Sequence, residues 1–306
     1  MRSVALALLL GGCLIVRADE VPLDEPCPTS QPSLLAAASG PFVLGDAIYF
    51  VGGSGMLTRL SYAGGPPAEL TTEPVLATRL AYDGALYWTT ETEVLRLPVT
   101  GGAPAAIVSG YPNGSVIAVD DSHVVWATTT GLQRWSKADQ MVEMLDTGDL
   151  FLGLAIYEGV AYYSVTSGEL VRRAPPTETI AAAHFPGPLV VDEAGVYYYE
   201  AADPFLDHAG MLRLVPRDGG EPVTTADGLA RVYDLASDDT NLYLATSYGD
   251  EYRIQQVSRF GGEVHTLACG DALLTPPPLS VAADPSGVYF ADGRGLYHLD
   301  RATLPR

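Results

Sequence analysis

The sequence predicts an all-β protein made from seven copies of one short unit. In each copy an Asp- or Gly-containing turn precedes an apolar-aromatic strand, which is followed by a short loop, an alternating strand and a Gly-rich turn. The clearest copy is residues 82–110 (YDGALYWTT, TEVLRLPVTGG, APAAIVSG). The copies recur at intervals of 36 to 46 residues, near the period of roughly 40 residues of four-stranded propeller blades. The apolar anchors of the aromatic strands are Ile48, Leu86, Val124, Val160, Val196, Leu242 and Val288.

The alternating strand of each copy explains how the copies pack together. In EVLRLPV, the apolar Val94, Leu95 and Leu97 mix with Arg96, and such a period of two places side chains on both faces of a strand. A single four-stranded blade cannot bury both faces alone, whereas blades stacked around an axis can. The sequence therefore predicts a β-propeller of four-stranded blades, seven by the count of anchors.

The two ends of the repeat suggest how the ring closes. The seventh copy stops soon after its second recognisable strand, and so it lacks an outer strand. The segment 32–40 (PSLLAAASG) resembles the outer-strand segment APAAIVSG of the second copy. We expect residues 33–39 to supply the outer strand of blade seven. The alternative is a loose lead-in or a helix, because Leu-Leu-Ala-Ala-Ala has helical propensity.

The N-terminus is typical of an exported protein. Residues 1–18 combine Arg2 with an apolar run and end before Asp19, as in a cleaved signal peptide. Alternatively, Leu-Gly-Gly-Cys resembles a lipobox, which would end the signal before Cys13 and attach a lipid there. Residues 19–32 form a Pro-rich tether, and residues 33–306 the single propeller domain. We expect a periplasmic protein, an outer-membrane lipoprotein or an extracellular protein.

The net charge and the cysteine content limit the classes of partner and the covalent links that we expect. The net charge is −20, and Lys137 is the only lysine. Such a surface repels phosphate backbones and anionic membranes, so we expect no nucleic-acid partner and no membrane contact other than an N-terminal lipid. We also expect a monomer. An exported compartment permits a disulfide between Cys27 and Cys269; the alternative is two unpaired thiols.

The second copy resembles the YWTD-type and TolB-like propeller repeats. The resemblance rests on Ala85–Thr90 (ALYWTT), on Val94–Leu97 and on the Gly101-Gly102 turn, and as a pattern it covers nearly the whole chain after the signal. Two features depart from it: the final Asp of the YWTD pattern is Thr90 here, and most such families have six blades. Six blades are therefore the alternative to seven. The resemblance implies a scaffold role rather than a reaction.

Three insertions in copies five to seven mark the predicted binding face. They are residues 200–210, residues 247–252 and residues 270–278, and in a propeller all three project from the same face. Loops on a rigid scaffold commonly carry function, although solvated turns of variable length are the simpler alternative. Carboxylates and aromatic rings in these loops are suited to a metal ion such as calcium, a cationic group or a sugar. The candidate residues are Asp203, Phe205, Asp207, His208, Tyr248, Asp250, Glu251, Tyr252 and Asp271.

No catalytic signature accompanies the repeat. The sequence contains neither an HExxH zinc motif nor a GxSxG nucleophile elbow. We therefore expect a non-enzymatic exported scaffold that binds a protein, peptide or glycan, with no cofactor beyond a bound calcium ion. The alternative is a metal-dependent hydrolase or lyase of the lactonase type with its metal at the axial opening. The mainly apolar inner strands argue against that alternative.

Overall fold

The computed structural model describes residues 27–28, 32–110, 114, 116–128, 131–147, 150–173, 177–201, 210–248, 251–271 and 280–305. The predicted signal peptide with Cys13, and most of the Pro-rich tether, lie outside these residues.

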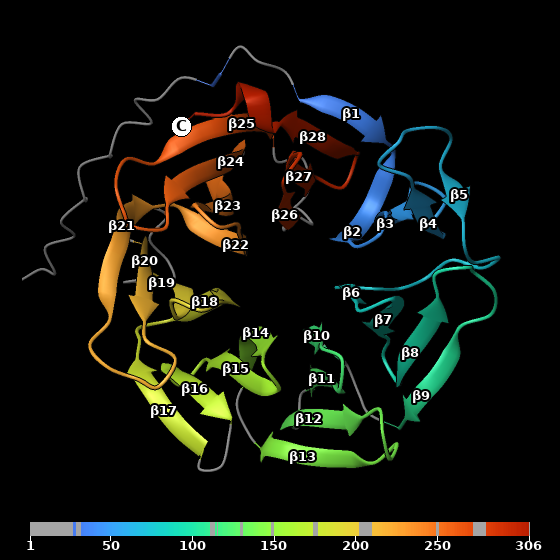
Figure 1. Cartoon of the computed structure of the whole chain (residues 1–306), viewed down its shortest axis with the longest axis horizontal. Coiled ribbons are helices and arrows are strands. Elements are labelled where there is room, and N and C mark those ends of the chain that lie inside the picture. The colour runs from blue at the N-terminus through green and yellow to red at the C-terminus, as the bar shows by residue number, and fades with distance from the viewer. Residues whose placement is uncertain are drawn as a thin grey trace, which may run out of the picture.

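The described residues form seven four-stranded antiparallel sheets arranged as blades around a central axis (Figure 1). The predicted seven-bladed propeller is thereby confirmed, and the six-bladed alternative is wrong.

Blade one is β2 (Ala38–Leu44), β3 (Ile48–Gly52), β4 (Leu57–Leu60) and β5 (Ala68–Glu69), and blade two is β6 (Ala81–Tyr82), β7 (Ala85–Thr89), β8 (Glu93–Pro98) and β9 (Ala105–Ser109). Blade three is β10 (Ile117–Val119), β11 (His123–Thr128), β12 (Gly131–Ser136) and β13 (Val142–Thr147), and blade four is β14 (Phe151–Tyr157), β15 (Val160–Val165), β16 (Glu169–Arg173) and β17 (Thr177–Ala182). Blade five is β18 (Pro186–Val191), β19 (Val196–Ala201), β20 (Gly210–Val215) and β21 (Val223–Leu229), and blade six is β22 (Arg231–Ser237), β23 (Asn241–Tyr248), β24 (Glu251–Ser258) and β25 (His265–Asp271).

Blade seven is built from both ends of the chain. Its inner three strands are β26 (Ser280–Asp284), β27 (Gly287–Ala291) and β28 (Leu296–Asp300), and its outer strand is β1 (Ser33–Ala36). In β1, Ser33 is opposite His298 and Ala36 is opposite Leu296, and Figure 1 shows the two strands side by side. Closure by the N-terminal segment is thus confirmed. The strand ends earlier than the predicted 33–39, because the buried Ala38 already begins the inner strand of blade one.

The period of two in the sequence matches the packing between blades. All five residues of β7 are buried. Leu86 and Trp88 pack against blade one, whereas Ala85 and Tyr87 pack against blade three. The core is therefore divided into seven apolar clusters, each shared by two neighbouring blades.

Helical structure is limited in the described part of the chain to one short 3-10 turn, η1 (Arg301–Thr303), after β28. No helix among the described residues has the length and apolarity needed to cross a membrane.

Candidate functional site

The strand ends that flank the three insertions lie on one face of the ring, because each blade is a meander. The turn between the second and third strands of a blade and the connection to the next blade lie at the same ends of the strands. The pairs β19 and β20, β23 and β24, and β25 and β26 flank such a turn or connection, and residues 202–209, 249–250 and 272–279 lie between them in the sequence. Asp203, Phe205, Asp207, His208 and Asp250 lie outside the described residues. We call the side on which these flanking strand ends lie the loop face.

The backbone brings three of the predicted positions together at one edge of blade six. Glu251 is opposite Tyr248 in the β23–β24 pair, and it is opposite Asp271 in the β24–β25 pair. The Glu251 carboxylate accepts a hydrogen bond from the Arg253 Nε–H at 2.7 Å. Tyr248, Glu251 and Asp271 are therefore adjacent strand ends at the base of two of the insertions.

Tyr252, another predicted position, has a different environment. Its side chain is only 6% exposed and packs in the cluster between blades six and seven. Its hydroxyl donates a hydrogen bond to Asp292 Oδ2 at 3.2 Å, and burial raises the pKa of that hydroxyl. In the structure Tyr252 thus stabilises the joint between two blades beneath the loop face.

Cys27 and Cys269 form a disulfide, with their Cα atoms 6.0 Å apart. The bridge ties the segment before β1 to β25, the outer strand of blade six. Glu251 Oε1 lies 3.8 Å from Cys27 Sγ. Among the described residues, these three side chains are the one group of three metal-ligating residues brought within reach of a common ion. Because the two sulfurs are bonded to each other, Glu251 is the remaining donor of that group.

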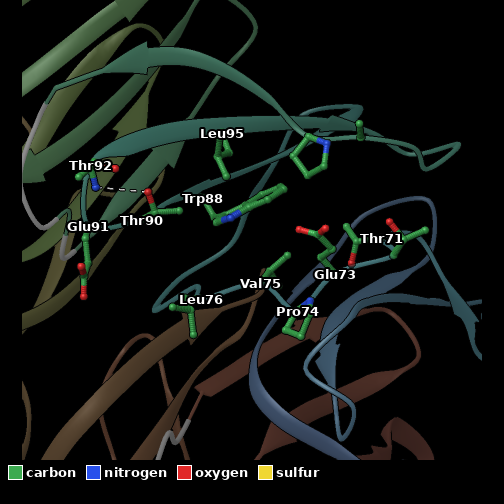
Figure 2. Close-up of a pocket in the computed structure, with 13 residues that line it drawn as sticks. Thr71, Glu73, Pro74, Val75, Leu76, Trp88, Thr90, Glu91, Thr92 and Leu95 are labelled. Atoms are coloured by element: carbon green, nitrogen blue, oxygen red, sulfur yellow. Dashed lines mark hydrogen bonds between the residues drawn. The ribbon is translucent and has the colours of Figure 1, made fainter.

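A second part of the loop face holds a cavity of about 540 Å³ between blades one and two. It is formed by the connection from β5 to β6 and by the β7–β8 turn. Figure 2 shows Trp88 and Leu95 of blade two facing Glu73, Pro74 and Val75 of the connection. The cavity is lined by Thr71, Thr72, Glu73, Pro74, Val75, Leu76, Trp88, Thr90, Glu91, Thr92, Leu95, Ala103 and Pro104.

The chemistry of this cavity is mixed. Trp88 is fully buried, and no acceptor for its indole N–H is found among the described residues. Leu76 is 79% exposed at the mouth. Glu73 and Glu91 are also exposed, and they add two carboxylates. The Thr90 hydroxyl oxygen accepts hydrogen bonds from the backbone N–H of Thr92 and of Glu93, which fixes the turn on one side. The arrangement offers an apolar wall with a polar, acidic rim.

Our sequence interpretation did not identify this cavity. A signal for it was nevertheless present, because residues 70–80 form the longest connection between neighbouring blades of the ring. Long connections in a compact repeat are often functional. The insertions in copies five to seven instead predicted a site on the opposite side of the ring.

The same connection ends in a contact across the central channel. Arg79 lies just before β6, and its guanidinium forms an ion pair of 2.8 Å with Asp234 of β22 in blade six. Asp234 also accepts a hydrogen bond from the Val281 N–H at 3.0 Å. This axial carboxylate is therefore engaged by a cation and a backbone donor, and the long connection is anchored at the axis.

Comparison with solved structures places the fold in its class. The extracellular domain of a hybrid two-component system from B. thetaiotaomicron is similar over 87% of this chain, with 13% identity and a TM-score of 0.68. The match covers 39% of that domain, so this chain spans about two fifths of its length. The WD40 β-propeller domain of Doa1 is similar over 89% of this chain and 99% of its own, with 13% identity and a TM-score of 0.64. A chain of a nidogen/laminin complex is 17% identical over 67% of this chain and 86% of its own, with a TM-score of 0.51.

These likenesses define the protein as a seven-bladed β-propeller. At such low identity they show the fold alone. No protein-family model matches the chain, and no curated protein matches its sequence.

Proposed function

We propose that the protein is an exported or surface-anchored scaffold that binds a protein, peptide or glycan through its loop face. The observation that carries this proposal is the cavity between blades one and two, which opens on the same face as the strand ends that flank the insertions of blades five to seven. Binding on this face uses a rigid ring to position adaptable loops.

The size and lining of the cavity suit such a partner. About 540 Å³ is within the range of ligand pockets, which combine apolar walls with a few polar groups. Trp88 and Leu95 provide apolar wall on one side, and Leu76 provides an exposed apolar contact. Glu73 and Glu91 can accept hydrogen bonds from sugar hydroxyls or from peptide N–H groups. A peptide loop or one to two sugar rings fits this chemistry.

Export is supported by several features. The N-terminal sequence resembles a signal peptide or a lipoprotein signal. The Cys27–Cys269 disulfide is typical of an oxidising compartment. A structural neighbour is an extracellular domain, and another occurs in a nidogen/laminin complex. Within the propellers, we infer a relationship to the YWTD-type and TolB-like repeats from the ALYWTT strand.

The test uses two exposed apolar residues on opposite faces. Leu76 is on the loop face and is 79% exposed, whereas Phe260 is 90% exposed in the β24–β25 turn on the other face. The purified chain and its Leu76→Asp and Phe260→Asp variants are applied to glycan and peptide arrays. We expect the wild type and Phe260→Asp to bind the same ligands and Leu76→Asp to lose them.

Binding that survives Leu76→Asp but is lost in Phe260→Asp would place the site on the face opposite the loop face and would contradict the proposal. Turnover of a defined substrate that disappears in Asp207→Asn or His208→Ala would replace the scaffold proposal with an enzyme.

A further inference from the structure

On the face opposite the loop face, a recurrent contact joins neighbouring blades. In each blade, one residue of the third strand pairs with the anchor residue of the second strand. We call the position two residues after this third-strand residue the clasp position. At four joints this position is basic and forms an ion pair with an acid in the first turn of the preceding blade. The pairs are Lys137–Asp83, Arg217–Glu158, Arg259–Asp192 and Arg301–Asp238.

A tyrosine of the preceding blade completes each clasp. The guanidinium of Arg301 lies 2.5 Å from Asp238 Oδ2 and donates a hydrogen bond to the Tyr243 hydroxyl, with its carbon 5.7 Å from the ring centroid. Arg259 lies 2.5 Å from an Asp192 carboxylate oxygen and 5.5 Å from the Tyr197 ring. Carboxylate and aromatic face together hold a cation in a partly dry site.

At the joint between blades seven and one, the same acid and tyrosine lack their cation. The turn acid is Asp284 and the tyrosine is Tyr289, but the clasp position holds Tyr62. Tyr62 meets Tyr289 edge to face, with ring centroids 6.2 Å apart. Burial and the charge of Asp284 raise the pKa of the Tyr62 hydroxyl, so the ring remains neutral.

The Asp284 carboxylate is half satisfied by its own turn. Its Oδ1 accepts hydrogen bonds from the Ser286 hydroxyl at 2.6 Å, from the Ser286 N–H at 2.7 Å and from the Gly287 N–H at 3.2 Å. Within the described part of the chain, Asp284 has no ion pair and its Oδ2 has no hydrogen bond. In Asp238 the corresponding Oδ2 is the oxygen that binds Arg301.

A cavity of about 520 Å³ lies at this joint. Its walls include Tyr62, Asp284, Tyr289 and His298, and the His298 ring stacks on Tyr289 with centroids 4.5 Å apart. The remaining walls come from β1, from Ile48, from the β4–β5 hairpin and from the turn after Asp284, and they are mainly apolar. A cation entering here meets two phenol rings and one carboxylate with a free oxygen.

The joint between blades one and two shows that a missing clasp cation does not by itself leave such a site. There the clasp position is Val99, but Asp46 has other partners. The Tyr82 hydroxyl donates a hydrogen bond to Asp46 Oδ1 at 2.6 Å and its ring stacks on Tyr49, and the Arg59 guanidinium lies 3.5 Å from Asp46 Oδ2. Tyr82 pairs with the anchor of its blade, and Leu44 is the corresponding residue in blade one. Leu44 has no hydroxyl to donate, and His298, which corresponds to Arg59 in blade seven, forms no ion pair with Asp284 in the described part of the chain.

We propose that the cavity at Asp284 binds the guanidinium of an arginine side chain from a partner polypeptide. The guanidinium lies against Tyr289 and Tyr62 and donates a hydrogen bond to Asp284 Oδ2, as the chain's own arginines do at the other joints. The net charge of −20 favours the approach of a basic segment. This site is on the opposite face from the cavity at Trp88 and does not depend on the function proposed for it.

The test measures binding to the full chain by NMR titration with three small probes: N-acetylarginine amide, N-acetylcitrulline amide and free arginine. Citrulline keeps the shape of arginine but has no charge. We expect blocked arginine to bind about tenfold more tightly than blocked citrulline, because a charge-assisted hydrogen bond contributes roughly that factor. We expect free arginine to bind no more tightly than blocked arginine, because its α-ammonium and α-carboxylate cancel and leave it with the same net charge.

Two variants locate the binding, and a third is the control. Asp284→Asn keeps an acceptor for the turn but removes the charge, and it should weaken binding of blocked arginine about tenfold. Tyr62→Arg supplies the missing clasp cation from the chain itself and should abolish binding. Asp121→Asn changes an exposed turn acid of blade three on the same face, and it should leave binding unchanged.

The proposal fails if citrulline binds as well as arginine, or if binding is equal in Tyr62→Arg and the wild type. It also fails if no arginine-dependent shift is seen at millimolar probe. Tighter binding of free arginine than of the blocked form would overturn the assignment to a polypeptide side chain. If Asp284→Asn does not fold, Tyr62→Arg still decides the outcome.

Discussion

The joints on the two sides of blade one differ from four of the other joints in the ring. Blades two and three, four and five, five and six, and six and seven are each joined by a basic residue that pairs with an acid of the preceding blade. The joints that flank blade one have Tyr62 and Val99 at the clasp position. Both cavities described above lie at these two joints, one on each face.

One repeat thus supports two kinds of joint between blades. Where the cation is present, it fills the space between turn acid and tyrosine and stabilises the ring. At the joint between blades seven and one, where it is absent, Asp284 Oδ2 has no hydrogen bond within the described residues. Blade one is also the place where the chain closes on itself through β1, and its outer strand β5 has only two residues. Backbone pairing in blade seven stabilises this part of the ring.

Breaking a clasp should have the largest effect on stability. Arg259 is 9% exposed and donates hydrogen bonds to the backbone carbonyls of Asp238 and Asp239 as well as pairing with Asp192. Arg259→Leu leaves these acceptors without their partner, and we expect it to lower the free energy of unfolding by about 3 kcal/mol. Urea denaturation measures this loss.

The joint between blades seven and one, where the clasp position holds Tyr62 instead of a cation, is called the open joint. The matched variant there is Tyr62→Leu. It removes ring contacts but leaves no newly unpaired charge, and we expect a loss of about 1 kcal/mol. Equal losses for the two variants would show that clasped and open joints do not differ in the way described.

Removing the disulfide should have a smaller effect than breaking the clasp of Arg259. The bridge holds the segment before β1 against blade six, and so it keeps β1 near its partner strand β28. We expect Cys27→Ser with Cys269→Ser to lower the free energy of unfolding by about 2 kcal/mol, because the cross-link restricts the unfolded chain. Calorimetry of the double variant measures this, and a reductant should destabilise the wild type but not the variant. An unchanged melting temperature in the variant would contradict the role given to the bridge.

The clasp of Asp238 should contribute to the pH dependence of the free energy of unfolding below about pH 4. Burial acts to raise the pKa of Asp238, but hydrogen bonds from Tyr243, from the Thr240 and Asn241 N–H groups and from Arg301 outweigh it and lower the pKa to about 2. A carboxyl with a depressed pKa in the folded state contributes stability that is present above its ordinary value of 3.8. That stability is lost as the pH falls from about 4 to about 2.

Because Asp238 is partly exposed, solvent screening reduces this contribution to about 1 kcal/mol. Asp238→Asn should therefore lose less stability than the wild type between pH 5 and pH 2, as measured by urea denaturation at each pH. Asp121→Asn, which alters an exposed turn acid, should follow the wild type. A parallel pH dependence of Asp238→Asn and the wild type would contradict the clasp at Asp238.

The architecture could be predicted from the sequence because it depends on local patterns. The anchors recur once per blade, and the segment beginning at Ser33 matches the missing outer strand of blade seven. Alternation such as that of Leu86 and Tyr87 indicates which faces are buried. Each of these features can be recognised within a single copy or by comparing two copies.

The sites were harder to predict, because they depend on contacts between distant parts of the chain. Arg79 and Asp234 meet across the axis, although they belong to blades on opposite sides of the ring. The cavity at Trp88 depends on how the long connection 70–80 folds over blade two. The clasp residues Lys137, Arg259 and Arg301 stand in turns, where alternation predicts nothing about their partners. The insertion residues Asp203, Phe205, Asp207 and His208 stay predictions.

The most direct test of the account is a double-mutant cycle at the open joint. The free energy of unfolding is measured for the wild type, Tyr62→Arg, Asp284→Asn and the double variant. If the joint between blades seven and one is a clasp without its cation, Tyr62→Arg should be more favourable by about 1 kcal/mol with Asp284 present than in the Asp284→Asn background. A coupling energy of zero would show that Asp284 and the clasp position do not form the site found at the other joints.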